Sequence, residues 1–401
     1  MNLLKKTWKN KLVACSAALV TLLAPFAAGS AVANAYDGDI PINKETFPCD
    51  AFQEYVKAKW DTDKNGILSV HERMTVGMIH FNLWTNEPEE LTSFKGIEYA
   101  PNIGMIIARN GSLVSLDISK NPNLHTLDVT NNQIDALDIS HNPNLREIHI
   151  GHNNVKQLDV KNHKYLEKLN AGDNELSSID VTQNAELDTL DVARNHIASV
   201  DVTNNKKLWS LDVSGNGLSD VDVQQNKELG RLYASDNNLT SLDLSQNEEL
   251  LALQVSNNQL PNIDLSNNQK IDQFDVSHNR LNYVRLTHER DMRGDIPYLF
   301  NVEVHDNPLL GADIEGRLIG FDTRAQDEQQ QTYVTKERSL DLLQINKYLT
   351  TKKITKIEGG TIKNGVIVPN TYPGTVKYDY YAGHLDSDWG VTWKTTVRFE
   401  K

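Results

Sequence analysis

Cysteine is nearly absent from this sequence, since only Cys15 and Cys49 occur among 401 residues. Cys15 falls in an N-terminal segment with the character of a removable signal, which leaves Cys49 as the single thiol of the mature chain. A chain with one cysteine forms no intramolecular disulfide, so its stability must come from packing. The neighbouring Phe47 and Phe52 favour a buried apolar role for Cys49 over an intermolecular link.

Long apolar runs are confined to the N-terminus. Four lysines precede an apolar run that begins near Leu12, and Ala33-Asn34-Ala35 has the A-x-A form of a cleavage site. We therefore predict that residues 1–35 are a secretory signal, cut before Tyr36. No later run reaches 18 apolar residues, so no transmembrane segment is expected after cleavage, and no L-P-x-T-G sorting motif follows. A secreted, extracellular protein is expected, with non-covalent retention at the cell surface left open.

Positive charge is also scarce. The chain has 40 Lys and Arg against 54 Asp and Glu, a formal net charge of −14, and removal of the four signal lysines makes it −18. So negative a chain is not expected to bind nucleic acid. The G-x-S-x-G, H-E-x-x-H and phosphate-binding glycine motifs are absent, and histidines are scattered. We expect a protein that is not an enzyme.

The most informative feature present is a repeat of 21 residues, plainest as LHTLDVTNNQIDALDISHNPN from Leu124 to Asn144. Nine units follow one another without insertion, beginning at Ile103 and ending in Leu286. Apolar residues recur at unit positions 1, 4, 6, 11, 14 and 16, and alternation at positions 4 and 6 predicts a short strand. Each unit is too small to bury a core alone, so the units must stack with parallel strands about 4.8 Å apart. A curved, mostly β solenoid results.

Two polar positions recur with the repeat. Asn at position 9, from Asn132 to Asn279, is expected to form an amide ladder that satisfies backbone groups at the buried turn. Asp at position 15, from Asp117 to Asp264, forms a column of like charges. We favour turn capping, in which each carboxylate accepts backbone N–H groups, over the alternative that the column collects cations.

The pattern L-x-x-L-x-V-x-x-N-x-L resembles the leucine-rich repeat, and its 21-residue length with L-D-[VIL]-S-x-N is similar to secreted bacterial, internalin-type repeats. This resemblance covers about half the chain and implies a recognition protein with a long binding face. It departs from some internalin-type repeats at position 6, where they stack cysteine and this chain has Ala, Val or Ile, so cysteine-ladder chemistry is absent.

A second motif precedes the repeats. Residues 50–60 have the apolar spacing of an amphipathic helix, and residues 61–72 resemble a complete EF-hand loop, within a predicted cap of residues 47–75. Oxygen donors at alternate loop positions suit Ca²⁺. The expected metal ligands are Asp61, Asp63, Asn65, the Ile67 carbonyl, Ser69 and Glu72. A solvated acidic turn without metal is the structural alternative.

The remaining segments complete the expected domain organisation. Residues 36–46 lack periodicity and are expected to be a flexible lead-in. Residues 76–102 are similar to a degenerate repeat that caps the solenoid. The solenoid itself is expected over residues 103–320, a linker over residues 321–331, and a β-sandwich-like module over residues 332–401, which is rich in strand and turn signals and resembles the immunoglobulin-like modules that follow bacterial leucine-rich repeats.

Side chains at positions 2, 3, 5, 7 and 8 should face solvent on the strand surface. Most are small or acidic, but arginine, histidine and aromatic residues of the kind that anchor partners cluster there. The candidate partner-binding residues are Arg146, His149, His152, Trp209, Arg231 and Tyr233. The resemblance implies a monomeric, adhesin-like protein that binds an extracellular protein or glycan; a passive spacer and a secreted enzyme with its chemistry in the C-terminal module remain as alternatives.

Overall fold

The computed structural model describes residues 38–82, 91–286, 298–299, 301–314, 317–318, 331–347, 349, 351–384 and 390–401. The chain divides into residues 1–38 and residues 39–401, and every element below belongs to the second unit. The predicted signal segment and nearly all of the predicted linker lie outside the described residues.

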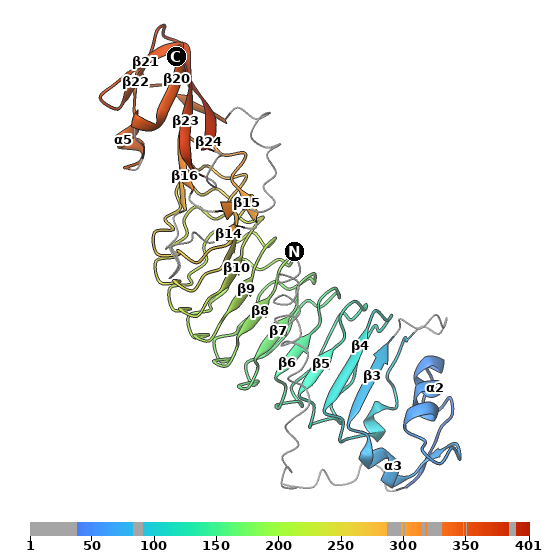
Figure 1. The fold of residues 1–401 in the computed structure, drawn as a ribbon. Coiled ribbons are helices and arrows are strands. Elements are labelled where there is room, and N and C mark those ends of the chain that lie inside the picture. The colour runs from blue at the N-terminus through green and yellow to red at the C-terminus, as the bar shows by residue number, and fades with distance from the viewer. Residues whose placement is uncertain are drawn as a thin grey trace, which may run out of the picture. The chain divides into compact units, whose positions relative to one another are not determined.

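The repeats build one parallel sheet of 11 strands, which confirms the predicted solenoid (Figure 1). Ten of the strands stack in chain order, and β15 follows β12. The strands are β3 (Met78–Asn82), β4 (Met105–Arg109), β5 (Thr126–Asp128), β6 (Glu147–His149), β7 (Lys168–Asn170), β8 (Thr189–Asp191), β9 (Ser210–Asp212), β10 (Arg231–Tyr233), β11 (Ala252–Gln254), β12 (Gln273–Asp275) and β15 (Asn301–Glu303).

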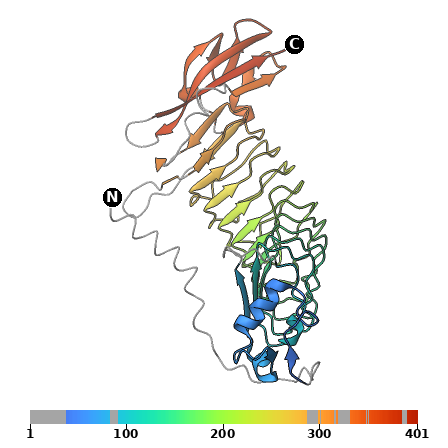
Figure 2. The ribbon, with the colours of Figure 1, turned by 90° about the vertical axis from the view of Figure 1, so that its right-hand side faces the viewer.

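Strand pairing repeats the sequence register without slippage. Leu127 lies opposite Ile148, and Leu232 lies opposite Leu253, so residues at the same unit position are always neighbours. Phe274 pairs with Val302, so a last half-unit that begins at Leu299 returns to the register after an insertion of seven residues. Figure 2 shows these strands as a single row with the connecting loops on the other side. The side chains at positions 1, 4, 6 and 11 fill the space between and are almost all fully buried.

The predicted ladder of asparagines at position 9 is present. Each amide joins two coils, as Asn195 shows: its Nδ2 donates to the carbonyls of Ala171, Val192 and Ala193 at 3.0–3.1 Å, and its Oδ1 accepts the N–H of Leu176 at 2.9 Å. Asn195 is 4% exposed. One side chain thereby bonds four backbone groups, and one of them, the Leu176 N–H, would otherwise be left unpaired in the core.

A second ladder, not predicted from the sequence, runs along position 19. Asn205, for example, donates from Nδ2 to the carbonyls of Val181 and Asn184 at 3.0 and 2.8 Å, and it is fully buried. His163 occupies the same position in its unit and places Nε2 3.2 Å from the Ile139 carbonyl oxygen. The regularity was visible in the sequence, but whether a polar position faces inward depends on how the second half of the coil folds back.

The aspartates at position 15 cap turns, as predicted. The Oδ1 atom of each of the eight accepts the backbone N–H two residues later, at 2.9–3.1 Å. In Asp201 the hydroxyl of Thr203 donates to the same oxygen at 2.6 Å. These hydrogen bonds from Thr203 hold the pKa of Asp201 below its usual value of 3.8.

This column predicts loss of stability in acid. A carboxyl whose pKa is lower in the folded state stabilises it above the unfolded pKa, and the contribution disappears as pH falls through both values. Asp201→Asn keeps the acceptor oxygen but cannot ionise. The difference in melting temperature between wild type and Asp201→Asn should therefore be present at neutral pH and should shrink as the pH falls through the usual aspartate pKa of 3.8 and below it. A difference that stays constant over that range in thermal melts would contradict the assignment.

The N-terminal cap consists of α2 (Asp50–Lys59), β2 (Ile67–Leu68) and α3 (Val70–Thr75). Phe52 and Val56 of α2 are fully buried with Phe47 and Trp60, as the helical spacing predicted. Cys49 is 6% exposed in the same core, as the prediction of a buried role for this residue required. Strand β3 pairs in parallel with β4, and Leu91 is fully buried, so the described part of residues 76–102 packs onto the first repeat; its origin as a degenerate capping repeat stays a prediction.

The expectation of a flexible lead-in over residues 36–46 is wrong for its described part. β1 (Ile40–Pro41) pairs antiparallel with β2, and the N–H of Ile42 donates to the Gly66 carbonyl at 3.0 Å. Ile42 is also buried. Backbone pairing needs no hydrophobic periodicity, so a two-residue strand leaves no pattern in the sequence.

The C-terminal module has two sheets that share one core around Tyr378, Val397 and Ile367, in keeping with the expected sandwich-like module. Tyr283 and Leu310 from the last coils belong to that core, and the Tyr378 hydroxyl donates to the Leu310 carbonyl at 3.0 Å. The module thus covers the apolar end of the solenoid. Its first sheet contains β18 (Gln331–Thr335), β24 (Gly390–Phe399), β23 (Gly374–His384) and β20 (Ile354–Glu358), and its second β19 (Leu340–Asp341), β22 (Val366–Pro369) and β21 (Gly360–Lys363).

The other elements near this end are short. They are β13 (Tyr283–Leu286) paired with β16 (Gly311–Ile314), β14 (Tyr298–Leu299) paired with β17 (Arg317–Leu318), and α5 (Leu342–Ile345). Within the described part of the chain, none of the helices has the length and apolar character needed to cross a membrane.

Candidate functional site

The acidic loop between α2 and α3 closes around its own carboxylates. Gly66, with φ of +81°, permits the sharp turn that an L side chain would strain. Asp61 accepts the N–H groups of Asn65 and Gly66 at 3.2 and 2.9 Å, and Asn65 Oδ1 accepts the N–H of Ile67 at 2.7 Å. The loop therefore turns its side-chain oxygens inward.

Carboxylate oxygens of Asp61, Asp63 and Glu72 lie within 4.8 Å of one another. Asp61 and Glu72 are only 5% and 4% exposed. Within the described ranges, no lysine or arginine forms an ion pair with any of the three. Three neighbouring negative charges repel one another and favour a bound cation, and an all-oxygen donor set is the one that calcium prefers.

Hydrogen bonds from Thr62 and Ser69 fix the carboxylate of Glu72, the last residue of the loop. Its Oε1 accepts the N–H and hydroxyl of Thr62, both at 2.7 Å, and its Oε2 accepts the N–H and hydroxyl of Ser69, both at 2.9 Å. Burial opposes ionisation of Glu72, but these hydrogen bonds outweigh it and lower its pKa to about 2. The side chain is thus ionised at neutral pH. Ser69 is the N-cap of α3 and is engaged with Glu72.

Of the predicted ligands, then, the structure gathers the Asp61, Asp63 and Glu72 carboxylates. Asn65 lies beside them, with Nδ2 2.8 Å from Asp63 Oδ2. Ile67 is in β2, where its backbone faces Pro41 of β1. Sequence reasoning missed this pairing, which braces the metal-type loop with the segment that precedes the cap.

On the strand face, Trp209 and Arg231 come together across β9 and β10. The Arg231 guanidinium carbon lies 4.7 Å from the centre of the Trp209 ring, a cation–π distance. A Cβ at Gly230 would lie 2.5 Å from Trp209 Nε1, so the glycine makes room for the ring. Trp209 remains 41% exposed although its ring contacts Arg231 and lies close to Gly230. Tyr233, two residues after Arg231, is half-buried.

The other predicted group, Arg146, His149 and His152, contacts neighbouring acidic side chains. Arg146 pairs with Glu167 at 2.5 Å, and His149 lies 3.9 Å from Glu147, which also binds Lys168. The neighbouring His149 and the hydrogen bond from Lys168, opposed by burial, lower the pKa of Glu147 to about 2.

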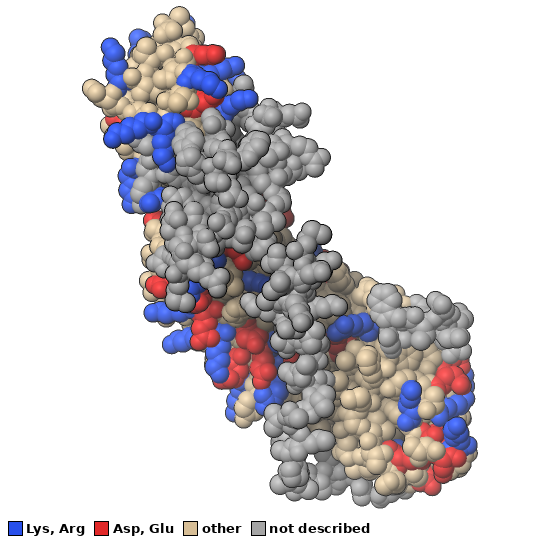
Figure 3. Space-filling model, viewed as in Figure 1, with Lys and Arg blue, Asp and Glu red and all other residues tan. Residues whose placement is uncertain are grey.

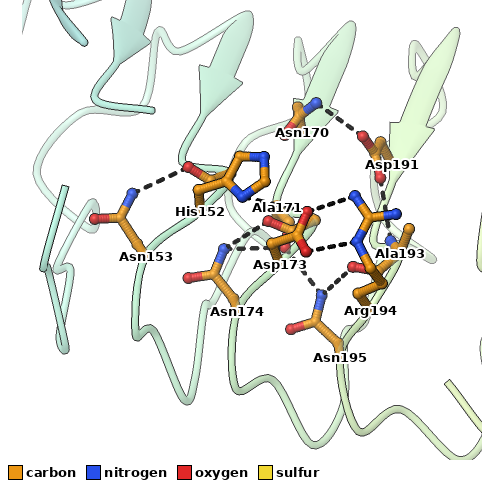
Figure 4. A network of polar contacts seen from close by, with 12 residues as sticks. His152, Asn153, Asn170, Ala171, Asp173, Asn174, Asp191, Ala193, Arg194 and Asn195 are labelled. Atoms are coloured by element: carbon orange, nitrogen blue, oxygen red, sulfur yellow. Dashed lines mark hydrogen bonds and ion pairs between the residues drawn. The ribbon is translucent and has the colours of Figure 1, made fainter. Parts of the chain in front are cut away.

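His152 faces Asp173 at 3.4 Å, and Arg194 binds the same carboxylate through two hydrogen bonds of 2.5 Å (Figure 4). Arg146, His149 and His152 therefore each have an acidic neighbour within the face, and this group is a poorer anchor than Trp209.

Leu251 is a surface residue that sequence reasoning missed. It occupies position 2, two coils after Trp209 with Gly230 between them, and it is 37% exposed. Trp209, Gly230 and Leu251 thus form an uncharged row beside Arg231. Elsewhere Figure 3 shows basic and acidic side chains next to each other along the coils, with a broad uncharged area near β4 and β5.

Comparison with known proteins agrees with the repeat register. A family model described as a leucine-rich repeat matches residues 120–140 and 204–224. The fold is a leucine-rich-repeat solenoid. No curated protein matches the sequence.

Two solved structures share this leucine-rich-repeat fold. The functional domain of InlJ from Listeria monocytogenes has a TM-score of 0.57 and 21% identity, covering 90% of this chain and 99% of that one. The internalin InlF from Listeria monocytogenes has a TM-score of 0.53 and 18% identity, covering 72% and 94%.

InlJ is described as including a cysteine ladder. The repeats of this chain contain no cysteine, and position 6 is filled by Ala, Val or Ile, for example Ala171 and Val192, both fully buried. The same fold is therefore packed here by aliphatic side chains, as the sequence predicted.

Proposed function

We propose that this chain is a secreted, non-enzymatic recognition protein that binds an extracellular protein or glycan through the strand face of its leucine-rich repeats. The observation that carries the proposal is the exposed Trp209 ring, which stacks with the Arg231 guanidinium and lies close against Gly230. A rigid, partly exposed aromatic group loses little conformational entropy when it binds, which is why Trp and Arg are common anchors at interfaces.

The repeat scaffold supports this role because it leaves the face rigid. Paired strands and the two ladders fix the backbone on either side of Trp209, so the uncharged row of Trp209, Gly230 and Leu251 is organised before a partner arrives. Secretion through residues 1–35 is part of the same proposal and rests on the signal-like sequence alone.

The binding proposal predicts a specific loss of affinity. For a ligand selected from a panel of extracellular proteins and glycans, Trp209→Ala should weaken binding about thirtyfold, the effect of removing an anchor worth about 2 kcal/mol. Val114→Ala is the control, because Val114 is 55% exposed but lies at position 12 of its unit, in the second half of the coil and away from the strand face. Surface plasmon resonance with immobilised ligand measures both.

Equal affinity of wild type and Trp209→Ala would place the binding surface elsewhere. Absence of any ligand in the panel would favour the passive spacer, and catalytic turnover of an extracellular substrate by the full-length protein would favour the secreted enzyme.

We also propose that the loop from Asp61 to Glu72 binds calcium and that the ion acts structurally, as a clamp on the N-terminal cap. The support is the convergence of two buried carboxylates with Asp63 and the absence of a balancing cation among the described residues. Asp61, Asp63, Asn65, Ile67, Ser69 and Glu72 would hold it, and the affinity is expected to be that of an extracellular site, with Kd of ~10⁻⁴ M or weaker.

A further inference from the structure

Two histidines and two carboxylates meet where the regular repeats end. His278 is at position 8 of the ninth unit, while Glu303, His305 and Asp306 are at positions 5, 7 and 8 of the last half-unit. Because β12 and β15 pair with Asp275 opposite Glu303, the loops that follow them lie side by side. This juxtaposition depends on the half-unit returning to register after the insertion.

The four side chains are in direct contact. Asp306 Oδ2 lies 2.7 Å from His305 Nδ1 and 3.2 Å from His278 Nε2, so one carboxylate oxygen is shared by two imidazoles. The imidazole rings meet edge to face, with centroids 4.9 Å apart. Glu303 Oε2 lies 3.5 Å from His305 Nε2, on the other side of that ring.

Two imidazole nitrogens and one carboxylate oxygen, all within 4.8 Å, are a donor set for a divalent transition metal. Ring nitrogens are poor ligands for calcium, which prefers oxygen, so this cluster differs in kind from the Asp61–Glu72 loop. A metal would lie between the ring nitrogens and the Asp306 carboxylate oxygen that now contact one another directly. Glu303 is placed to accept the remaining ring N–H of His305, an arrangement that orients metal-bound histidines.

The backbone holds these groups without the metal. His278 and Asp306 both have left-handed φ, of 52° and 53°, and the N–H of His278 donates to the His305 carbonyl at 3.0 Å. Directly after them, Asn279 and Asn307 anchor the turns in the buried ladder. The ligands therefore project from fixed turns, which reduces the cost of assembling a site.

A comparison within the chain shows that position alone does not create the cluster. His152 also occupies position 8 and also faces an aspartate, Asp173, one coil later (Figure 4). There Arg194 occupies the carboxylate with two hydrogen bonds, and Gly172 stands at position 7, where His305 stands in the last half-unit. The His152 group thus has a single imidazole, and its aspartate is already paired with Arg194. It is therefore a control for metal binding at the His278 cluster.

We propose that His278, His305 and Asp306 form a site for a divalent transition metal, with zinc as the expected ion and Glu303 as the residue that orients His305. Three protein ligands leave one coordination position for water or for a donor atom from a bound partner. His278 is 47% exposed and His305 27% exposed, so the open position faces solvent. The site is independent of the calcium loop and of the Trp209 anchor.

The test is calorimetric titration of zinc into chelator-treated full-length protein without a histidine tag. Wild type and His152→Gln should each bind one ion at this site. Glu303→Gln removes the residue that orients a ligand and should weaken zinc binding about 10–100-fold. His278→Gln removes a ligand itself and should weaken zinc binding by more than that. Cobalt(II) added to wild type should give the visible absorption of a tetrahedral site, and His278→Gln should abolish it.

Zinc binding with unchanged stoichiometry and affinity in the His278→Gln/His305→Gln double variant would overturn the proposal, as would the absence of binding to wild type. Both rings are partly exposed, and Gln retains hydrogen-bonding capacity, so the variants should fold; matching circular dichroism and melting curves verify this. Excess calcium should leave the zinc isotherm unchanged, and Glu72→Gln should bind zinc as wild type does. Competition by calcium would assign the heat to the acidic loop instead.

Discussion

Calcium at about one hundred times a Kd of ~10⁻⁴ M is expected to stabilise chelator-treated protein by about 2.7 kcal/mol, and Glu72→Gln is expected to lose this effect. The reason is that Asp61, Asp63 and Glu72 share one small volume without a balancing cation among the described residues. The amide of Gln carries no charge and offers a single oxygen, so it cannot bind an ion through two. Calorimetric titration should give one ion for wild type, and thermal melts should show the stabilisation.

Glu54→Gln is the matched control for this experiment. Glu54 is an exposed acid on α2 that pairs with Lys57 at 2.6 Å, close to the loop in sequence but outside the carboxylate cluster. It should bind calcium as wild type does. If wild type shows neither heat of calcium binding nor a change in melting temperature, the loop is an acidic turn stabilised by its own hydrogen bonds. The role of the Glu72 carboxylate is then to accept the hydrogen bonds of Thr62 and Ser69.

Asn195→Ala is expected to lower the free energy of unfolding by about 3 kcal/mol or more. The substitution removes four hydrogen bonds and leaves the N–H of Leu176 unpaired in the core, where a buried unpaired group costs about 1–3 kcal/mol. Because repeats are stabilised by their neighbours, the loss should concentrate in the coils that Asn195 joins. Chemical denaturation measures the total, and hydrogen exchange locates it.

Asn204→Ala is the control for the general effect of replacing an asparagine by alanine in a turn of the same coil. Asn204 is exposed and makes one hydrogen bond, to the Thr182 carbonyl at 3.2 Å. Its replacement should change stability by no more than about 0.5 kcal/mol. Equal destabilisation by the two substitutions would mean that the position 9 amide is not what holds the coils together.

Much of the fold follows from periodicity. A spacing of 21 residues with apolar side chains at fixed positions admits one arrangement, in which Leu127 and Ile148 stack in neighbouring parallel strands. The same logic fixed the position 9 ladder and the turn-capping role of Asp201, since a side chain that recurs in every coil must meet its own copy. The calcium-type loop was also readable, because its ligands are local in sequence.

Contacts that produce no periodic pattern could not be predicted from the sequence. The pairing of Ile40 and Pro41 with β2 uses only backbone groups, so the segment looked unstructured. The core that the C-terminal module shares with Tyr283 and Leu310 joins residues far apart in the chain.

The sequence by itself thus determined the repeat, the register and the types of side chain that each coil presents to solvent. Only the tertiary structure decided which of these side chains cooperate. Arg231 lies over Trp209 because Gly230 leaves room, while His152 contacts Asp173 one coil further on, and Arg194 from the coil after that pairs with the same carboxylate. His278 meets His305 because the chain returns to register after an insertion whose length no repeat predicts. Cooperation depends on distances of a few ångströms between coils, and a linear pattern specifies position along the chain but not those distances.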